Sequence, residues 1–173
     1  MKGYLLDTNA LSDWLDSTKP RHASVSRRIE ELAAGKALLL TSTIVLGEIE
    51  YGIKVAPQER QQSLDKLRAQ IDVEFVHERL LLNVTRSTTI VYGDLRARVF
   101  EKYAGKERKK GLRPEELVCP TTSKVLGIQE NDLWIAAQAI ERNMVLASND
   151  THMMRIREAA TELDVEDWGS IRP

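Results

Sequence analysis

The fold is set by the run Ile128-Gln-Glu-Asn-Asp-Leu-Trp-Ile-Ala-Ala-Gln-Ala-Ile-Glu-Arg-Asn-Met-Val-Leu-Ala-Ser-Asn-Asp150, which predicts a helix, a tight turn and a buried strand in succession. Small and apolar residues recur at helical spacing from Leu133 to Ile140, so one face of this helix is suited to packing on a sheet. Asn143 is a residue type that can close a helix. The apolar run at 144–147 is typical of a strand covered on both faces, as in parallel sheets.

Two acidic residues lie at the start and the end of this run. Asp132 precedes Ile135 and Ala136 by three and four residues, so its carboxylate points toward the interior near the helix start. The helix dipole favours an acid there, but burying it without a partner is costly. Asp150 follows the predicted strand, which places a second acid at a strand's carboxyl end.

Two further acids belong to the first strand–helix pairs of the chain. An apolar strand at 4–6 runs into Asp7. Taken alone, this position fits Asp7 or Thr8 as the N-cap of a helix over 10–15 at least as well as it fits a site residue. A second buried strand, at 37–40, is followed by the capping cluster 41–43 and by a helix over 44–52. Glu48 lies on an apolar ridge of that helix and needs a cation there; the alternative is an exposed glutamate. Glu50 is rotated away and is expected to be exposed.

Other segments continue the alternation of strands and helices. The patterns predict helices at 25–34, ending at Gly35, and at 58–71, a strand at 73–76, a long helix at 80–103, a short helical turn near 153–156 and an edge strand at 163–168. Alternating elements of this kind predict an α/β fold, a three-layer α/β/α domain with a mostly parallel central sheet. The length of 173 residues favours one domain covering residues 1–173.

Composition narrows the class of protein. A formal charge of -1 excludes a globally basic nucleic-acid binder, although a local basic patch remains compatible with it. Cys119 is the only cysteine, so neither a disulfide framework nor a cysteine-rich zinc site is expected. No apolar run approaches the length of a membrane span, and we expect a soluble cytoplasmic protein without membrane contact.

A basic, glycine-flanked segment covers residues 105–114 and is expected to be a loop. The segment is either a solvent-exposed loop without a binding role or a loop that binds a phosphate backbone beside an acidic site. In the second case the residues that would contact the backbone are Lys106, Arg108, Lys109, Lys110 and Arg113. His152 lies close to Asp150 in sequence, but a single histidine without a spaced partner is more often a surface or packing residue.

The four acids predict one kind of chemistry. Asp7 and Asp150 follow strands, Glu48 and Asp132 occupy helices next to strand ends, and the carboxyl edge of a parallel sheet is where ligands bind. Four carboxylates gathered there would repel one another unless a divalent cation screened them, and oxygen-only ligation selects Mg²⁺ or Mn²⁺. Such a site predicts hydrolysis of a phosphodiester without a covalent enzyme intermediate.

Other chemistries fit the sequence less well. It contains no Gly-x-Ser-x-Gly elbow, Walker loop or Gly-x-Gly-x-x-Gly turn, and the lone cysteine has no evident histidine partner. The run Leu5-Leu6-Asp7-Thr8-Asn9 faintly resembles the strand-end aspartate of haloacid-dehalogenase-like enzymes. Asn9 stands where those enzymes need a second acid, which disfavours that interpretation.

In four segments the chain resembles PIN-domain ribonucleases, and within them the toxin half of VapBC toxin–antitoxin modules. The matching motifs are Leu6-Asp7-Thr8-Asn9, Gly47-Glu48-Ile49-Glu50-Tyr51-Gly52, Asn131-Asp132-Leu133-Trp134-Ile135-Ala136-Ala137 and Ala147-Ser148-Asn149-Asp150. The resemblance implies that Asp7, Glu48, Asp132 and Asp150 are the catalytic, metal-binding acids. Asn9 and Ser148 match positions that support the site by hydrogen bonding. Between about Gly105 and Leu126 the chain is longer and more basic than the family pattern, as a loop insertion would be.

The same resemblance implies an activity and partners. These are Mg²⁺- or Mn²⁺-dependent endonucleolytic cleavage of RNA, homodimerisation, and inhibition by a small VapB-like antitoxin protein whose tail covers the acidic groove. The alternative is a noncatalytic PIN module that binds RNA or protein. The presence of all four acids favours the enzyme. The preference for RNA over DNA rests on the resemblance alone, because no residue pattern here recognises the 2′-hydroxyl.

Overall fold

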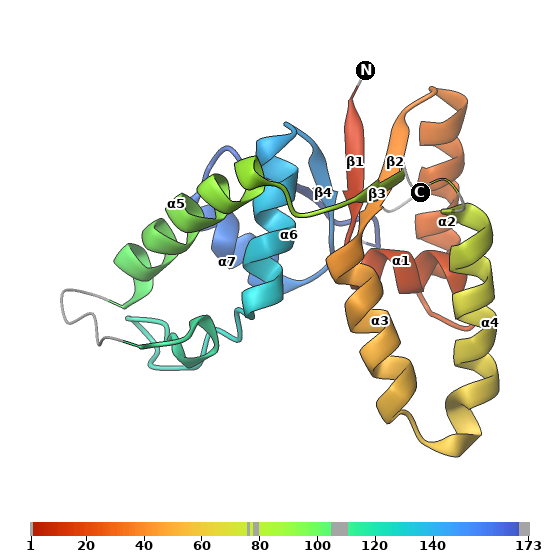
Figure 1. The fold of residues 1–173 in the computed structure, drawn as a ribbon, viewed down its shortest axis with the longest axis horizontal. Coiled ribbons are helices and arrows are strands. Elements are labelled where there is room, and N and C mark those ends of the chain that lie inside the picture. The colour runs from red at the N-terminus through yellow and green to blue at the C-terminus, as the bar shows by residue number, and fades with distance from the viewer. Residues whose placement is uncertain (1, 76, 78–79, 105–110, 170–173) are drawn as a thin grey trace. The chain divides into compact units, whose positions relative to one another are not determined.

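The structure, a computed structural model, describes residues 2–75, 77, 80–104 and 111–169. Five strands form one sheet in the order β3-β2-β1-β4-β5 (Figure 1). The elements are β1 (Gly3–Leu6), α1 (Thr8–Leu15), α2 (His22–Ala34), β2 (Leu38–Ser42), α3 (Thr43–Val55), α4 (Gln58–Glu74), β3 (Leu81–Leu82), α5 (Arg86–Tyr103), the 3₁₀ helix η2 (Pro114–Glu116), α6 (Glu130–Glu141), β4 (Val145–Ala147), α7 (Thr151–Ala159) and β5 (Asp164–Glu166).

The predicted fold class, a three-layer α/β/α domain with a mostly parallel sheet, is confirmed. β1 pairs with β2 in parallel, with Gly3 opposite Leu38 and Leu6 opposite Thr41. β2 pairs with β3 in parallel as well. In the part of the chain that the structure describes, no helix is long and apolar enough to cross a membrane.

The chain divides into two compact units, which are described separately. Unit 1 comprises residues 1–83, 147–149 and 166–173, and unit 2 comprises residues 84–146 and 150–165. The expectation of a single domain with an insertion at 105–126 stays a prediction.

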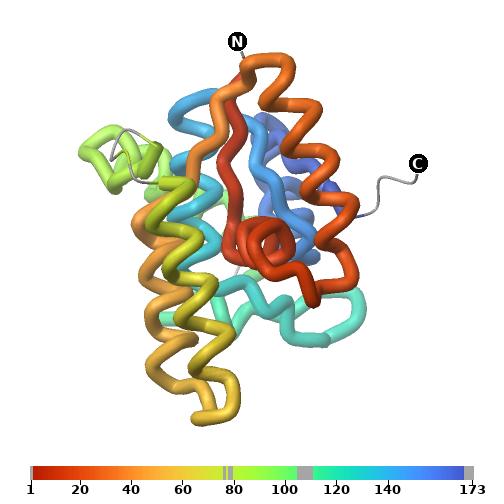
Figure 2. The backbone as a smooth tube through the Cα atoms, turned by 90° about the vertical axis from the view of Figure 1, so that its right-hand side faces the viewer, coloured from red at the N-terminus to blue at the C-terminus, as the bar shows by residue number. Residues whose placement is uncertain are grey.

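Unit 1 is built on β1 and β2. The helix α1 contacts α2, α3 and α4, and both α2 and α3 contact β2. Figures 1 and 2 show α3 and α4 running side by side as a helical hairpin. Leu5, Leu6 and Leu11 have no solvent exposure, so the strand and the first helix share one apolar core. The edge strand predicted at 163–168 is confirmed as β5, and Trp168 packs its ring on Tyr4 with 5.8 Å between centroids.

Helix ends in unit 1 follow local chemistry. Ser42, in the predicted capping cluster, is the N-cap of α3 and accepts a hydrogen bond from the Ile44 N–H at 3.0 Å. α2 ends at Ala34 as predicted, but the left-handed residue is Lys36, with φ 58°, and Gly35 keeps a negative φ of -76°.

The strand predicted at 73–76 is wrong for its described residues. α4 continues to Glu74, and Val73 is 71% exposed. Ile71 and Phe75 are the buried residues, and their spacing of four is that of a helix face. The third strand is instead β3, so the helix predicted to start at Leu80 begins only at Arg86.

Unit 2 is a group of three helices, in which α5 packs on α6 and α7, and α6 packs on α7. The side chains of Leu133, Ile135 and Ile156 are almost fully buried in this group. Tyr92 of α5 and Trp134 of α6 stack with centroids 3.7 Å apart. These contacts hold α6, the helix of the quoted run, in its place within unit 2.

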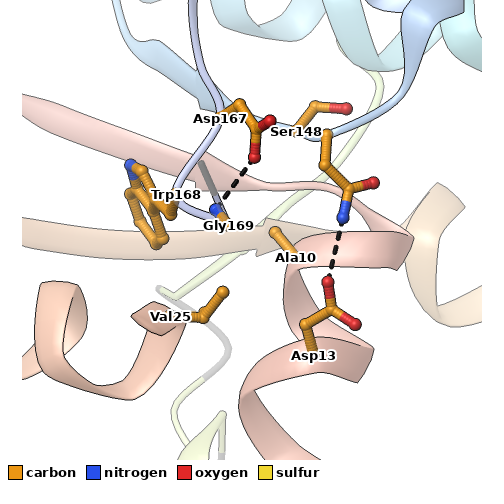
Figure 3. A pocket seen from close by; sticks show the side chains of 8 residues that line it. Ala10, Asp13, Val25, Ser148, Asp167, Trp168 and Gly169 are labelled. Atoms are coloured by element: carbon orange, nitrogen blue, oxygen red, sulfur yellow. Dashed lines mark hydrogen bonds between the residues drawn. The ribbon is translucent and has the colours of Figure 1, made fainter. Parts of the chain in front are cut away.

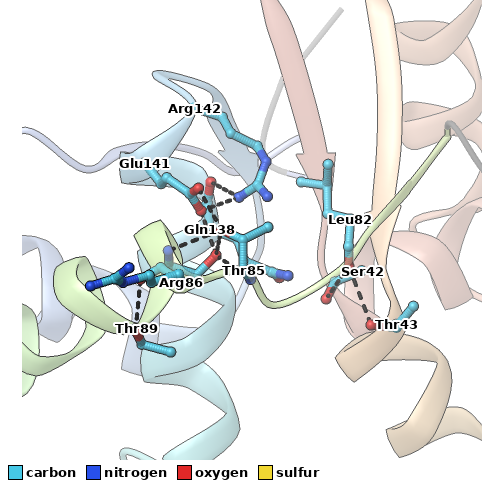
Figure 4. A network of polar contacts seen from close by, with 10 residues as sticks. Ser42, Thr43, Leu82, Thr85, Arg86, Thr89, Gln138, Glu141 and Arg142 are labelled. Atoms are coloured by element: carbon cyan, nitrogen blue, oxygen red, sulfur yellow. Dashed lines mark hydrogen bonds and ion pairs between the residues drawn. The ribbon is translucent and has the colours of Figure 1, made fainter.

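The start of α5 is fixed by a polar network within unit 2 (Figure 4). The Thr85 hydroxyl caps the helix by accepting a hydrogen bond from the Thr88 N–H. In return, the Thr85 N–H donates to the Thr88 hydroxyl, which completes a capping box. The Thr85 hydroxyl also donates to Glu141 of α6 at 3.0 Å, and Glu141 pairs with Arg142. The two helices are thereby joined by hydrogen bonds as well as by apolar contacts.

Candidate active site

Asp7 stands at the end of β1 and is the N-cap of α1. Its Oδ1 accepts the Ala10 N–H at 2.7 Å, so the capping interpretation of the sequence is correct. Its own N–H donates to the Ala147 carbonyl oxygen at 3.2 Å. Asp7 is only 4% exposed. Burying a carboxylate costs free energy unless other groups stabilise its charge, so a neutral side chain would cap α1 at lower desolvation cost.

Glu48 lies half-buried on α3, and the Thr8 hydroxyl donates to its Oε2. Thr8 directly follows Asp7, so Glu48 is bonded to the chain neighbour of the first predicted acid. Glu48 and Thr8 line a groove of about 350 Å³ that is otherwise mainly apolar and lies between α3 and α4. Glu50 is half-buried like Glu48, so the exposure expected for it is not found. The two glutamates of α3 differ in their partners: Glu50 is turned to Arg68, with its Oε1 2.6 Å from the guanidinium Nε.

Asp132 lies in the first turn of α6 and is 9% exposed, as predicted for an inner-face acid. Its Oδ2 accepts the Gln129 N–H at 2.8 Å, half of a capping box at this helix start. This bond fixes the orientation of the carboxylate and places negative charge at the positive end of the helix dipole.

Asp150 is the N-cap of α7 and lies beside His152. Its Oδ1 accepts the His152 N–H at 2.8 Å and lies 3.1 Å from the His152 Nδ1. The same Nδ1 is 3.8 Å from Asp132 Oδ2. His152 therefore lies between the two predicted acids of unit 2. The only sequence signal for this was the closeness of His152 to Asp150 in the chain, which was weak because a single histidine without a spaced partner is more often a surface or packing residue.

The remaining predicted residues have different positions. Ser148 is buried, and its N–H donates to the Glu166 carbonyl oxygen at 3.0 Å. Asn9 is exposed on α1. Arg113 precedes η2, and its N–H donates to Glu116 at 2.7 Å. Four predicted RNA-binding residues lie outside the described residues: Lys106, Arg108, Lys109 and Lys110.

Two of the predicted acids belong to each unit. In unit 1, Glu48 is bonded to Thr8, the residue after Asp7, and in unit 2 Asp132 and Asp150 flank His152. Among the residues described, no group of three or more His, Cys, Asp and Glu side chains has the arrangement of a metal site. That all four acids share one cation stays a prediction.

Gly127 lies so close to the His152 ring that a side chain at position 127 would clash with it. It has a φ of +73°, and a Cβ at this position would lie 2.6 Å from the His152 Nε2. Replacing Gly127 by Ala is expected to lower the free energy of unfolding by roughly 1–3 kcal/mol, because it adds backbone strain and a clash. Chemical denaturation measures the change.

Gly93 provides the matched control within the same unit. It lies in α5, is exposed, and a Cβ there would meet nothing within 4 Å. Gly93→Ala is expected to raise the free energy of unfolding by roughly 0.5–1 kcal/mol through helix propensity. Equal effects of the two alanines would contradict the close fit of Gly127 against His152.

The profile of the PIN domain family matches residues 4–159, which is most of the chain. The chain belongs to the PIN domain family. The match runs from β1 to the end of α7, so it includes the segments of all four acids. The resemblance predicted from the motifs is therefore confirmed at the level of the family.

Two similar proteins and one solved structure extend the comparison. The PIN-domain chain is 26% identical over 165 residues to Ribonuclease VapC2 of Rickettsia felis (strain ATCC VR-1525 / URRWXCal2), covering 95% of this chain and 97% of that protein. It is 27% identical over 168 residues to Ribonuclease VapC1 of Haemophilus influenzae (strain R2866), again covering 95% and 97%. The crystal structure of VapBC2 from Rickettsia felis bound to a DNA fragment from their promoter matches with a TM-score of 0.60 at 26% identity, covering 95% and 97%.

Proposed function

We propose that this PIN-domain chain is a metal-dependent endoribonuclease that hydrolyses RNA phosphodiester bonds as the toxin of a type II toxin–antitoxin pair. The observation that carries the proposal is the local placement of the four acids. Asp7, Asp132 and Asp150 stand at helix starts and Glu48 lies within α3, in the order of the family motifs, and Asp7 and Asp132 are both almost fully buried. An asparagine could accept the same backbone N–H groups at lower desolvation cost, so burial of the two charges supports a role beyond capping.

The similar proteins support this function and its partners. Two of them, matched over nearly their whole length, are named ribonucleases. The matched VapBC2 crystal structure is a complex bound to promoter DNA. By extension, we propose that this chain binds a small VapB-like antitoxin, forms a homodimer and acts on RNA in the cytoplasm.

The donor atoms of the four acids suit Mg²⁺ or Mn²⁺, because all are carboxylate oxygens. When bound, such an ion lowers the pKa of a coordinated water and neutralises charge on the phosphoryl group. The protein's own contribution is orientation. Asp7 and Asp132 each accept a backbone N–H at a helix start, and the Thr8 hydroxyl holds Glu48, so these three carboxylates keep fixed directions.

Removal of the metal tests the proposal. Purified protein incubated with total RNA is expected to cleave it in Mg²⁺ or Mn²⁺, to stop in excess EDTA, and to resume when the ion is restored. Gel electrophoresis of the RNA measures cleavage, and a DNA strand of matching sequence tests the preference for RNA. Binding of RNA that is unaffected by chelator, with no cleavage in any divalent ion, would instead support the noncatalytic PIN module.

A further inference from the structure

Asp13 is a buried acid that the four motifs do not include. It lies in the second half of α1, is 7% exposed, and its Oδ2 accepts the Asn149 Nδ2–H at 2.9 Å. Figure 3 shows the Asp13 carboxylate reaching this amide from α1, at a small cavity that Ser148 and Trp168 also line. Both partners belong to unit 1.

The position is unfavourable for a carboxylate in two ways. Burial removes its hydration, and the carboxyl-terminal half of a helix carries negative partial charge. A neutral asparagine at position 13 would accept the same hydrogen bond without either cost. The negative charge of Asp13 therefore does not serve the stability of α1. It strengthens the hydrogen bond from the Asn149 side chain, which is charge-assisted.

Asn149 directly precedes Asp150, so fixing Asn149 constrains where Asp150 can lie. Each of the three residues 147–149 is hydrogen-bonded to another segment of unit 1. The Ala147 carbonyl oxygen accepts the Asp7 N–H, the Ser148 N–H donates to the Glu166 carbonyl oxygen, and the Asn149 side chain bonds Asp13. The first two bonds use backbone groups. The third is formed by side chains and stands closest to Asp150.

We propose that Asp13 is a positioning residue for the fourth acidic motif: its carboxylate fixes Asn149 and thereby sets where the chain delivers Asp150. The inference rests on the proposed metal-dependent function. Asp13 itself touches neither metal nor substrate. Outer residues that orient a ligand in this way typically change metal affinity or activity by about 10- to 100-fold when they are lost.

A charge-swap series in the full chain tests the proposal. Asn149→Asp sets two carboxylates against each other and is expected to raise the Kd for Mn²⁺, measured by calorimetry without RNA, by about 10-fold or more. Asp13→Asn leaves an amide acceptor and is expected to have a smaller effect in the same direction. The double variant Asp13→Asn with Asn149→Asp restores a charge-assisted bond with reversed polarity, and the Kd is expected to return most of the way to that of the unaltered protein.

Two further readouts separate positioning from general stability. Hydrogen exchange of the backbone amides at 147–150 is expected to accelerate in Asn149→Asp and to recover in the double variant. Asp16→Asn is the matched control, since Asp16 follows α1 and bonds Thr18 but does not touch Asn149. It removes one negative charge from the same helix end and is expected to leave the Kd for Mn²⁺ and the exchange at 147–150 unchanged.

The outcomes are distinguishable. Unchanged exchange at 147–150 and unchanged Mn²⁺ affinity in Asn149→Asp, with only a lower Tm, would overturn the positioning role, as would a double variant that does not recover. If Asn149→Asp fails to fold, Asp13→Asn and the double variant carry the same comparison. If the unaltered protein neither binds Mn²⁺ nor cleaves RNA, the proposed function fails, while the exchange data still decide whether Asp13 fixes the segment.

Discussion

Replacing Asp132 by Asn is expected to lower the rate of RNA cleavage by about 100-fold or more while leaving the fold intact. Asn is the same size as Asp, and its side-chain oxygen can still accept the Gln129 N–H that Oδ2 now accepts. Only the negative charge is lost. If the carboxylate serves only as a cap, the substitution removes little; if it binds a cation, it removes a ligand charge from the site.

Cleavage of a labelled RNA at fixed Mg²⁺ measures this effect, and thermal unfolding checks the fold. Asp94→Asn is a suitable control in the same unit, because Asp94 is a well-exposed acid of α5 that pairs with Arg98 at 3.0 Å. We expect cleavage to be unchanged in that variant. Cleavage retained by Asp132→Asn, or lost equally in Asp94→Asn, would count decisively against a metal-binding role for Asp132. Asp7→Asn allows the same comparison in unit 1.

Much of the fold could be predicted because the strands are short apolar runs bounded by residues with clear local chemistry. Residues 144–147 follow Asn143, whose φ of 50° matches the role predicted for it, and the strand lies within one residue of its predicted bounds. The error at 73–76 has a physical cause. Alternation over four residues is compatible with a helix when, as at Ile71 and Phe75, the buried positions are four apart.

β3 was missed for a different reason. It is only two residues long, Leu81–Leu82, and its apolar pattern runs directly into that of α5. The boundary is set by Thr85, whose capping box with Thr88 starts the helix. A threonine in a polar stretch is a weak signal alone, so the sequence favoured one long helix over a strand followed by a helix.

The candidate site was predictable where an acid adjoins an element end, and less so where a contact joins separate elements. Asp7, Asp132 and Asp150 stand at helix starts, which local sequence reveals. The hydroxyl of Thr8 on Glu48 spans 40 residues, and the bond from Asn149 to Asp13 spans 136. Such pairs depend on packing of distant segments, for which a single sequence holds no periodic signal.

Glu48→Gln is expected to lower RNA cleavage by about 100-fold or more, and Glu50→Gln to leave it nearly unchanged. The two glutamates lie two residues apart on α3, so the pair controls for helix position, composition and loss of one charge. They differ in what they face. Glu48 is held by Thr8, next to Asp7, whereas Glu50 forms a salt bridge with Arg68.

Both substitutions are expected to change the stability of the fold only slightly, so a difference in cleavage between them reports on catalysis. Loss of the Glu50–Arg68 pair is expected to change the stability of the fold little, because both side chains are more than a third exposed and water screens their charges. Glu48→Gln keeps an acceptor for the Thr8 hydroxyl, so its Tm is expected to stay close to that of the unaltered protein. Cleavage and thermal unfolding measured side by side therefore separate the roles. If both variants cleave RNA at the unaltered rate, Glu48 has no part in catalysis.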